Sequence, residues 1–162
     1  MVLPWDKDFL SSETELSSKT ILYASEGQNV NNVSRSIVKK ILGNIDSKDY
    51  LNLPLEEIAS QNFIFLYPKD KSVIDIDQIR DSFKYLFLKS NSKRLLYLEN
   101  IEKVETRTFS TLLKFSEEAD KNMIICMATN NINIVPKTIL SRFQKLKIPK
   151  PSNEIVKQHL IN

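Results

Sequence analysis

The sequence predicts an α/β fold with a mainly parallel sheet of five strands flanked by helices. Four nearly continuous apolar runs, at residues 20–24, 63–67, 94–98 and 123–128, are typical of strands that are buried on both faces. Segments with helical periodicity separate these runs, and strands that alternate with helices favour parallel pairing. The 162 residues, 41% of them hydrophobic, are enough for the core of one ordinary domain.

The first strand–loop–helix unit opens the fold. The apolar run 20–24 predicts a short buried strand, and the polar residues 25–32 predict a loop. Apolar residues then recur at helical spacing: Val33, Ile37, Val38, Ile41 and Leu42. Gly43 follows where a helix commonly ends, so we expect the helix to end there.

The second unit begins with a connection, residues 44–61, that contains about one helical turn after Pro54. A buried strand at residues 63–67 comes next. Asp75 or Asp77 is expected to cap the following helix. Its apolar side chains share one face: Ile76, Ile79, Phe83, Leu86 and Phe87.

The later elements continue the alternation with a strand at 94–98, a helix at 105–118 and a strand at 123–128. The helix is expected to place these side chains on its inner side: Phe109, Leu112, Leu113 and Ser116. A short helical segment at 138–143 and a half-exposed strand at 145–148 complete the pattern.

A domain boundary is predicted where two prolines occur close together near the end of the chain. The core domain is expected to cover residues 1–149. Residues 150–162 are expected to form a linker and the start of a helical lid domain, in which Ser152 caps a helix that runs through Leu160.

The composition excludes several kinds of site. Cys126 is the only cysteine and His159 the only histidine, so neither a disulfide framework nor a metal centre is expected. No apolar run approaches the roughly 20 residues of a membrane span, and residues 1–10 lack the pattern of a secretory signal. The net charge of +3 predicts neither a strong nucleic-acid binder nor a membrane-surface protein. We therefore expect a cytoplasmic protein that does not contact a membrane.

The loop after the first strand is the place where such folds bind phosphate. A working phosphate loop has the pattern Gly-x-x-x-x-Gly-Lys-Ser/Thr, whose lysine meets the phosphates and whose hydroxyl binds Mg²⁺. Here the loop has no lysine and only one glycine, and the carboxylate of Glu26 would repel phosphate. The residues of this degenerate loop are Ser25, Glu26, Gly27, Gln28, Asn29, Asn31 and Asn32. We interpret it as a degenerate site and expect no nucleotide cofactor.

The end of the third predicted strand also departs from the pattern of nucleotide hydrolases. In those enzymes an acid at the end of the third strand holds Mg²⁺, and a neighbouring acid orients water. Here Glu99 stands in place of the shorter aspartate, and Asn100 cannot act as a base. A glutamate at a strand end is usually just solvated, but two altered hydrolytic positions together indicate a fold without catalysis.

Four segments, in order and at family-like spacing, resemble the subunits of the clamp-loader ATPase family. Residues 136–143 resemble the Ser-Arg-Cys box, with phenylalanine in the cysteine position. Residues 111–118 resemble the family helix Asn-Ala-Leu-Leu-Lys-Thr-Leu-Glu-Glu, and residues 75–80 resemble the segment that leads into its second helix. The Pro-Trp pair at residues 4–5 fits the start of the family sequence. The resemblance covers nearly the whole chain and implies a AAA+ core.

The motor subunits of that family keep the phosphate-loop lysine and an Asp-Glu pair, whereas this chain has neither. The pattern is similar to the delta-prime class of clamp-loader subunits in bacterial DNA polymerase III, which has lost ATP binding and acts as a rigid stator. This resemblance implies that Arg142 is an arginine finger for ATP on a neighbouring subunit, with Ser141 as a positioning residue. By itself, an arginine at this place indicates only a surface salt bridge. For a finger we expect Arg142 to be exposed and free of a strong salt bridge within the chain.

Other family features are altered or absent. Thr129 and Asn130 lie where the family has a polar sensor residue, and without local ATP we interpret them as structural. Many members bind zinc through four cysteines after the first helix, but residues 44–61 contain none, so no zinc is expected. Members also continue into a lid and a collar that drives oligomerisation. Because this chain stops at Asn162, its assembly by itself stays open.

We therefore expect a non-catalytic clamp-loader subunit of the DNA polymerase III holoenzyme, a DNA-directed DNA polymerase. Its implied partners are a gamma/tau-type ATPase and a delta-type subunit and, through the complex, the sliding clamp and primed DNA. One alternative is a motor-type ATPase with an unusual phosphate loop, which nucleotide binding would identify. Another is a AAA-like scaffold outside replication, which co-purification would test. Direct DNA binding is disfavoured, because basic residues are interspersed with acids and aromatic residues fall mostly on predicted core faces.

Overall fold

The computed structural model describes residues 16–25, 27–69, 73–88, 91–150, 153–154 and 157. Within them, five strands form one sheet in the order β2-β3-β4-β1-β5, and every neighbouring pair is parallel. The strands are β1 (Lys19–Ala24), β2 (Phe63–Leu66), β3 (Arg94–Leu98), β4 (Met123–Thr129) and β5 (Gln144–Ile148). This confirms the predicted α/β fold with a parallel five-stranded sheet.

The helices alternate with the strands. The α-helices are α2 (Val30–Asp46), α3 (Ile76–Phe87), α4 (Thr108–Glu118) and α5 (Lys137–Leu140). Short 3-10 helices are η1 (Leu55–Glu57), η2 (Ile101–Lys103) and η3 (Ile132–Ile134). The turn expected after Pro54 is therefore present as η1.

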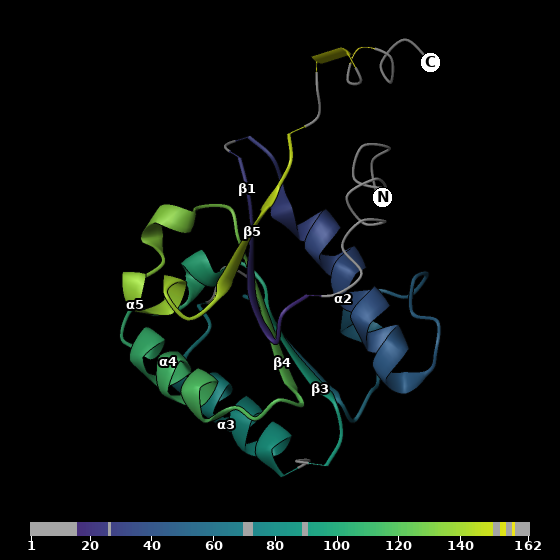
Figure 1. The fold of residues 1–162 in the computed structure, drawn as a ribbon, viewed down its shortest axis with the longest axis vertical. Helices are drawn as coiled ribbons and strands as arrows, with labels where there is room; N and C mark the ends of the chain where they lie inside the picture. The colour runs from purple at the N-terminus through teal and green to yellow at the C-terminus, as the bar shows by residue number, and fades with distance from the viewer. Residues whose placement is uncertain are drawn as a thin grey trace.

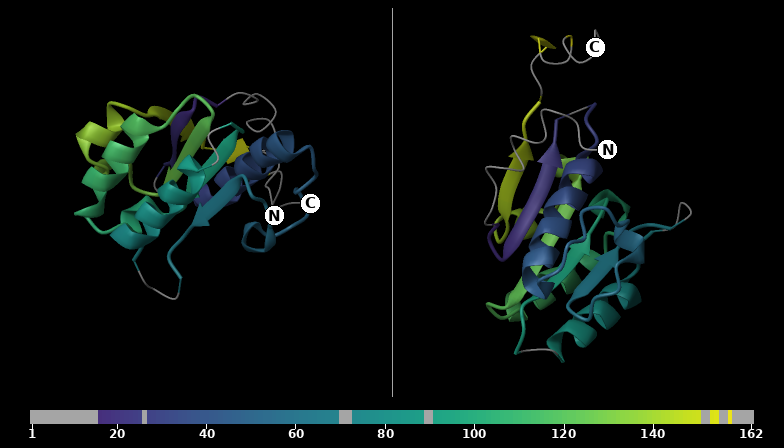
Figure 2. Two further views of the ribbon diagram at one scale, coloured as in Figure 1. Left: turned by 90° about the horizontal axis from the view of Figure 1, so that it is seen from below. Right: turned by 90° about the vertical axis from the view of Figure 1, so that its right-hand side faces the viewer.

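The sheet lies between two helical layers (Figures 1 and 2), with α2 on one face and α3, α4 and α5 on the other. Successive side chains of a strand point to opposite faces. In β1, Ile21 packs with the α3–α4 layer and Leu22 packs with the α2 layer, and both are fully buried. Two apolar clusters, one on each face, therefore hold the sheet.

Helix α2 begins earlier than the apolar spacing predicts. Asn29 caps it, because its Oδ1 accepts a hydrogen bond from the backbone N–H of Asn31 at 2.9 Å. The helix therefore starts at Val30, and Asn31 and Asn32 belong to its first turn rather than to the loop. The loop after β1 is correspondingly shorter than predicted.

Helix α2 also continues past Gly43, so the predicted end at this glycine is wrong. It ends at Asp46, and Ser47 adopts the left-handed conformation (φ 53°) while its N–H donates to the Gly43 carbonyl. The chain then turns back so closely that a Cβ on residue 43 would lie 2.7 Å from the Lys48 carbonyl oxygen. Glycine is thus required here by a close approach of the backbone, not by a helix end.

Several smaller differences follow from the position of each element. β2 is an edge strand, so only Phe63 is buried, and the expected full burial is wrong for the rest of β2. β5 is the other edge strand, and its predicted half-exposure is confirmed.

Helix α4 starts at Thr108, three residues later than expected. Of the two leucines expected on the inner side of α4, Leu112 is fully buried, whereas Leu113 is only partly buried.

The cap predicted for the third helix is confirmed at Asp75. Its side chain accepts from the backbone N–H of Gln78 at 2.9 Å, and the Gln78 side chain accepts from the Asp75 N–H at 3.0 Å. The Pro-Trp pair at residues 4–5, Ser152 and Leu160 lie outside the described residues. The division of the chain at residue 149 stays a prediction.

Candidate functional site

The carboxyl ends of the central strands bring the candidate nucleotide residues together. Ser25 follows β1, Glu99 and Asn100 follow β3, and Thr129 closes β4 with Asn130 directly after it. Because β1, β3 and β4 are parallel neighbours, these residues meet at one edge of the sheet, beside the start of α2. This is the edge at which open α/β sheets bind ligands.

The loop after β1 is closed by bonds within the chain. Gly27 has φ 84°, a left-handed conformation that favours glycine. The N–H of Gln28 donates to the Ser25 carbonyl at 3.0 Å, and its Nε2 donates to the Pro149 carbonyl at 3.2 Å. Gln28 thus ties the loop to the chain after β5. Glu26 lies outside the described residues.

At the N-terminus of α2, two asparagine side chains accept hydrogen bonds from the backbone in the place where a phosphate loop would hold an anion. Asn29 Oδ1 accepts from the N–H of Asn31. Asn130 Oδ1 accepts from the N–H of Val30 at 3.1 Å, across 100 residues of sequence. Two of the first N–H groups of the helix are therefore engaged by asparagines.

Glu99 is not solvated, as a glutamate at a strand end usually is, but is held by Arg35 of α2. The Arg35 Nε donates to Glu99 Oε2 at 2.5 Å and its Nη2 donates to Oε1 at 2.7 Å. The Glu99 side chain is 4% exposed and that of Arg35 32%. A fork of this kind is the strongest common pairing of arginine with a carboxylate. An internal cation therefore neutralises the acid that would face Mg²⁺ in a hydrolase.

Further groups extend this arrangement. Arg35 Nη1 also pairs with Glu56 Oε1 of η1 at 3.0 Å. The Tyr97 hydroxyl donates to Glu99 Oε2 at 3.2 Å and lies 2.6 Å from Ser34 Oγ. The hydrogen bond to Glu99 raises the pKa of Arg35, against the opposing effect of burial. Burial, together with the charge of Glu99, raises the pKa of Tyr97, so both groups keep their protons at neutral pH.

Arg35 was not found by sequence reasoning. It is the only charged residue in the first two turns of α2, residues 30–37, and that isolation is the signal that could have singled it out. Its partner Glu99 is 64 positions away, so no local pattern links the two.

The residues after β3 and β4 form a second group of polar contacts around Glu102. The Thr129 hydroxyl donates to Glu102 Oε2 at 2.8 Å, and Asn130 Nδ2 donates to Glu102 Oε1 at 3.2 Å. Asn130 also approaches Asn100, which adopts a left-handed conformation (φ 55°). Thr129 and Asn130 thus join the ends of β3 and β4. Sequence reasoning did not single out Glu102.

Arg142 lies at the end of α5, and the expectation that it lacks a strong salt bridge within the chain is wrong. Its Nε pairs with Glu117 Oε1 of α4 at 2.6 Å, in a pair whose side chains are 44% and 47% exposed. Its Nη1 donates to the Thr138 carbonyl at 3.2 Å and approaches Ser141 Oγ at 3.4 Å. Arg142 is exposed, as expected. All these partners belong to α4 and α5, so the structure does not join Arg142 to the loop after β1.

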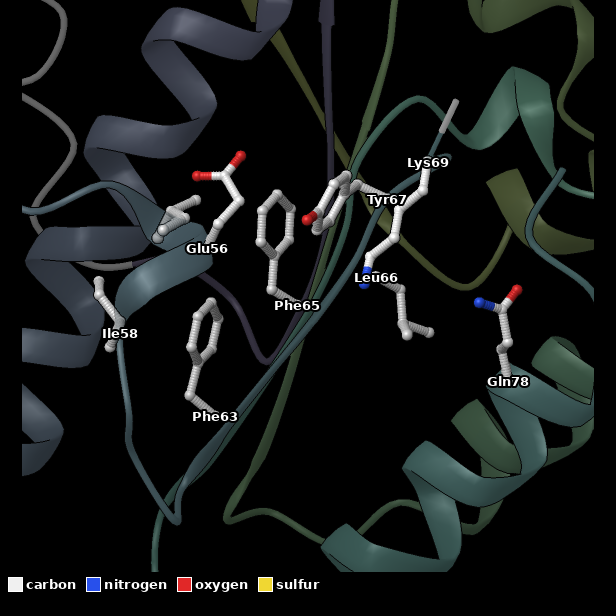
Figure 3. Close-up of a pocket in the computed structure, with 9 residues that line it drawn as sticks. Glu56, Ile58, Phe63, Phe65, Leu66, Tyr67, Lys69 and Gln78 are labelled. Atoms are coloured by element: carbon white, nitrogen blue, oxygen red, sulfur yellow. The ribbon is translucent and has the colours of Figure 1, made fainter. Parts of the chain in front are cut away.

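A pocket of about 300 Å³ lies beside the edge strand β2, between η1 and α3 (Figure 3). Phe63, Phe65 and Tyr67 form a stacked row along it, and Lys69 lies over the Tyr67 ring at 5.6 Å. Among its polar side chains, Glu56 is held by Arg35 and Gln78 closes the capping box of α3. These two side chains serve the fold, and we assign no chemistry to the pocket.

Within the part of the chain that the structure describes, no three His, Cys, Asp or Glu side chains are grouped so that they could hold a metal ion. Burial raises the pKa of the Cys126 thiol to about 12, so it stays protonated at neutral pH. No helix among the described residues combines the length and the apolar character that crossing a membrane requires.

Comparisons with known proteins find similarity at three levels: a family model, a relative in sequence and solved structures. The sequence model of the family described as "DNA polymerase III, delta subunit" matches residues 11–152. A protein of Buchnera aphidicola subsp. Baizongia pistaciae named DNA polymerase III subunit gamma is 33% identical over 105 residues, which are 62% of this chain and 28% of that protein. A crystal structure of a DNA polymerase III gamma subunit-related protein from Thermotoga maritima superposes with a TM-score of 0.62 at 16% identity.

These matches differ in what they establish. The structural match covers 93% of this chain and 47% of the Thermotoga protein, and at so low an identity it supports the fold alone. The chain thus spans about half of that structure and less than a third of the Buchnera relative. The family match extends over most of the chain, from before β1 to beyond β5.

Proposed function

Since the chain belongs to the DNA polymerase III delta subunit family of clamp-loader proteins, we propose that it is a non-catalytic subunit of the loader. In this role it supports the ATP-driven loading of a sliding clamp onto primed DNA without binding ATP itself. Its partners are a gamma/tau-type ATPase and a delta-type subunit, and it meets the clamp and the primed DNA through the complex. Such a complex works in the cytoplasm.

The fork between Arg35 and Glu99 is the observation that carries the proposed loss of ATP binding. A Mg²⁺ ion needs an available carboxylate at this strand end, and here both carboxylate oxygens accept from a guanidinium. The loop after β1 supplies no lysine, and asparagine side chains engage two N–H groups at the start of α2. Each of these features removes a different part of a nucleotide site.

Arg142 is the residue that we propose acts on a neighbouring subunit. Its side chain is 44% exposed; Nε forms an ion pair with Glu117 of α4, and Nη1 donates to the Thr138 carbonyl of α5. With this degree of exposure, the guanidinium is accessible to an anion on a neighbouring subunit. A guanidinium supplied in trans stabilises the charge on a transferring phosphoryl group. Ser141, 3.4 Å from Nη1, is the proposed positioning residue.

A motor-type subunit with an atypical phosphate loop is the alternative. The observation in its favour is the match to a relative named as a gamma subunit. Binding of Mg-ATP by the full-length subunit distinguishes the two proposals, because only the motor type needs it.

The role of Arg142 is tested with loader complexes reconstituted from full-length subunits of one organism. An arginine finger contributes roughly 10³–10⁵ in rate at its own site in well-studied hydrolases. A loader has several ATP sites, so R142A is expected to lower clamp loading strongly and total DNA-stimulated ATP hydrolysis only in part. R142K should restore little, because lysine lacks the planar fork.

Arg107 provides the matched control. It is also exposed and pairs with a glutamate of its own chain, Glu105, at 2.8 Å. R107A should therefore load clamps like the wild type. Equal loading by R142A and R107A, in complexes of equal composition, would show that Arg142 is an ordinary surface residue.

A further inference from the structure

The pair formed by Arg142 and Glu117 joins two helices that are separate in the sequence. Glu117 lies in the last turn of α4, and Arg142 follows α5. The contact joins Nε of Arg142 to Oε1 of Glu117 at 2.6 Å. The pair therefore fixes the direction of the outer part of the side chain.

The other contacts of Arg142 also restrain the orientation of its side chain. Nη1 donates to the Thr138 carbonyl at 3.2 Å, one turn back along the chain. Ser141 Oγ donates to the same carbonyl at 3.0 Å and lies 3.4 Å from Nη1. Groups of the same chain thus contact both Nε and Nη1, while the Arg142 side chain as a whole stays 44% exposed.

We propose that Glu117 is a positioning residue that pre-orients Arg142 for an anion on a neighbouring subunit, an inference that rests on the proposed role of Arg142. A free arginine side chain loses considerable rotamer entropy when it binds. Glu117 removes part of that freedom before assembly, while its own exposure keeps the guanidinium charge from being fully cancelled. Glu117 does not touch the ATP. It acts only through Arg142.

The neighbouring acid offers a control of the same kind. Glu118 is adjacent in α4, is similarly exposed at 51%, and lies 4.0 Å from Lys114 rather than near Arg142. E117Q and E118Q therefore remove the same charge from the same helix turn, but only E117Q loses the pairing with Arg142.

The test measures clamp loading by reconstituted complexes that contain E117Q, E118Q, R142A or the double variant R142A/E117Q. Exposed ion pairs change equilibria modestly, so E117Q should lower the loading rate about two- to fivefold. E118Q should load like the wild type. In the R142A background E117Q should change nothing, because its only route of action has been removed. Thermal unfolding of each subunit alone should be the same for E117Q and E118Q.

Each outcome decides between the claims. If R142A lowers loading but E117Q matches E118Q, the positioning role fails while the finger stands. Faster loading by E117Q, or a further loss in the double variant, also overturns the inference, because Glu117 would then restrain Arg142 or act by another route. If R142A itself loads normally, the proposed function fails, and the positioning role fails with it.

Discussion

The fork between Arg35 and Glu99 is the strongest electrostatic feature of the candidate site. Glu99 is almost fully buried, and a buried carboxylate is costly unless it is paired and hydrogen-bonded. Arg35 supplies two bonds and Tyr97 a third. The guanidinium group also lies over the Phe65 ring, with Cζ 5.4 Å from the ring centroid. One side chain thus supports the strand end, the edge strand and η1 together.

Loss of Arg35 should leave a buried, unpaired charge. R35M keeps most of the apolar stem and is expected to destabilise the fold by about 2–3 kcal/mol, less than for a fully buried pair because Arg35 is partly exposed. Urea unfolding measures the change. In the R35M background, E99Q should be neutral or stabilising, since it removes the unpaired charge.

Arg80, an exposed arginine that lies 3.6 Å from Asp77, is the control for R35M. R80M should change the stability by less than about 0.5 kcal/mol. An R35M loss no larger than that of R80M would contradict the role given to the fork.

A second ion pair leads to a prediction about pH. Arg94 is fully buried at the start of β3, and its Nη2 donates to Asp120 Oδ2 at 2.8 Å. This hydrogen bond lowers the pKa of Asp120 below the ordinary value of 3.8. A carboxyl whose pKa is lower in the folded state stabilises the fold above its unfolded pKa, and the contribution is lost as the pH falls through the folded pKa.

D120N should therefore be less stable than the wild type at pH 7, by about 1–3 kcal/mol. The difference should persist down to about pH 5 and shrink below about pH 4, as the wild-type carboxyl becomes protonated. Urea unfolding of both proteins across this range measures it. D81N, at an exposed aspartate 4.0 Å from Lys84, should stay within about 0.5 kcal/mol at pH 7. A D120N difference that grows in acid has the wrong sign for this account.

At the scale of elements, α2 shows how a close approach of the backbone overrides helix propensity. Alanine is favoured over glycine in a helix by about 1 kcal/mol. At Gly43 the new methyl group would meet the Lys48 carbonyl at 2.7 Å. The Ser47 and Lys48 N–H groups both donate to the Gly43 carbonyl, so the turn after the helix cannot move away without losing these bonds.

G43A should accordingly destabilise the protein by about 1–3 kcal/mol, in spite of the better propensity of alanine. The adjacent Asn44 is exposed in the same helix turn, and N44A should be neutral or slightly stabilising. Chemical unfolding of the two variants provides the comparison. A stabilising G43A would show that the turn after α2 relaxes at little cost.

The elements also show which features of the fold could be predicted from the sequence. The strand runs were predictable because burial on both faces requires continuous apolar residues, as in β3. The extension of α2 past Gly43 was not, because it depends on a contact with the turn that follows. The half-exposure of β2 depends on the strand order, which is set by packing between distant segments.

The same limit applies to the candidate site. The altered loop and Glu99 were recognisable from residue types at known positions. Arg35 and Glu117 were not, because their partners lie 64 and 25 positions away and only folding brings them together. Local patterns thus indicate which positions of a nucleotide site are altered, whereas the groups that contact these positions become visible only in the folded chain.

At the scale of the whole molecule, the polar groups fall in two separate places. The carboxyl edge of the sheet holds the closed loop, the fork and the contacts of Glu102. The α4–α5 side holds Arg142 with its positioning contacts. In our proposal the first place is inactive, and the second acts on a neighbouring subunit. A chain of this kind supplies part of an active site while lacking one of its own.

The most direct measurement of this account is a calorimetric titration of the full-length subunit with Mg-ATP, with the motor subunit of the same loader as the positive control. We predict no binding heat for this subunit at ATP concentrations up to about 1 mM, a range in which even weak sites are occupied. The loop after β1 lacks a lysine, and Arg35 holds Glu99. Saturable binding with a Kd in the micromolar range would contradict the account and would favour the motor-type alternative.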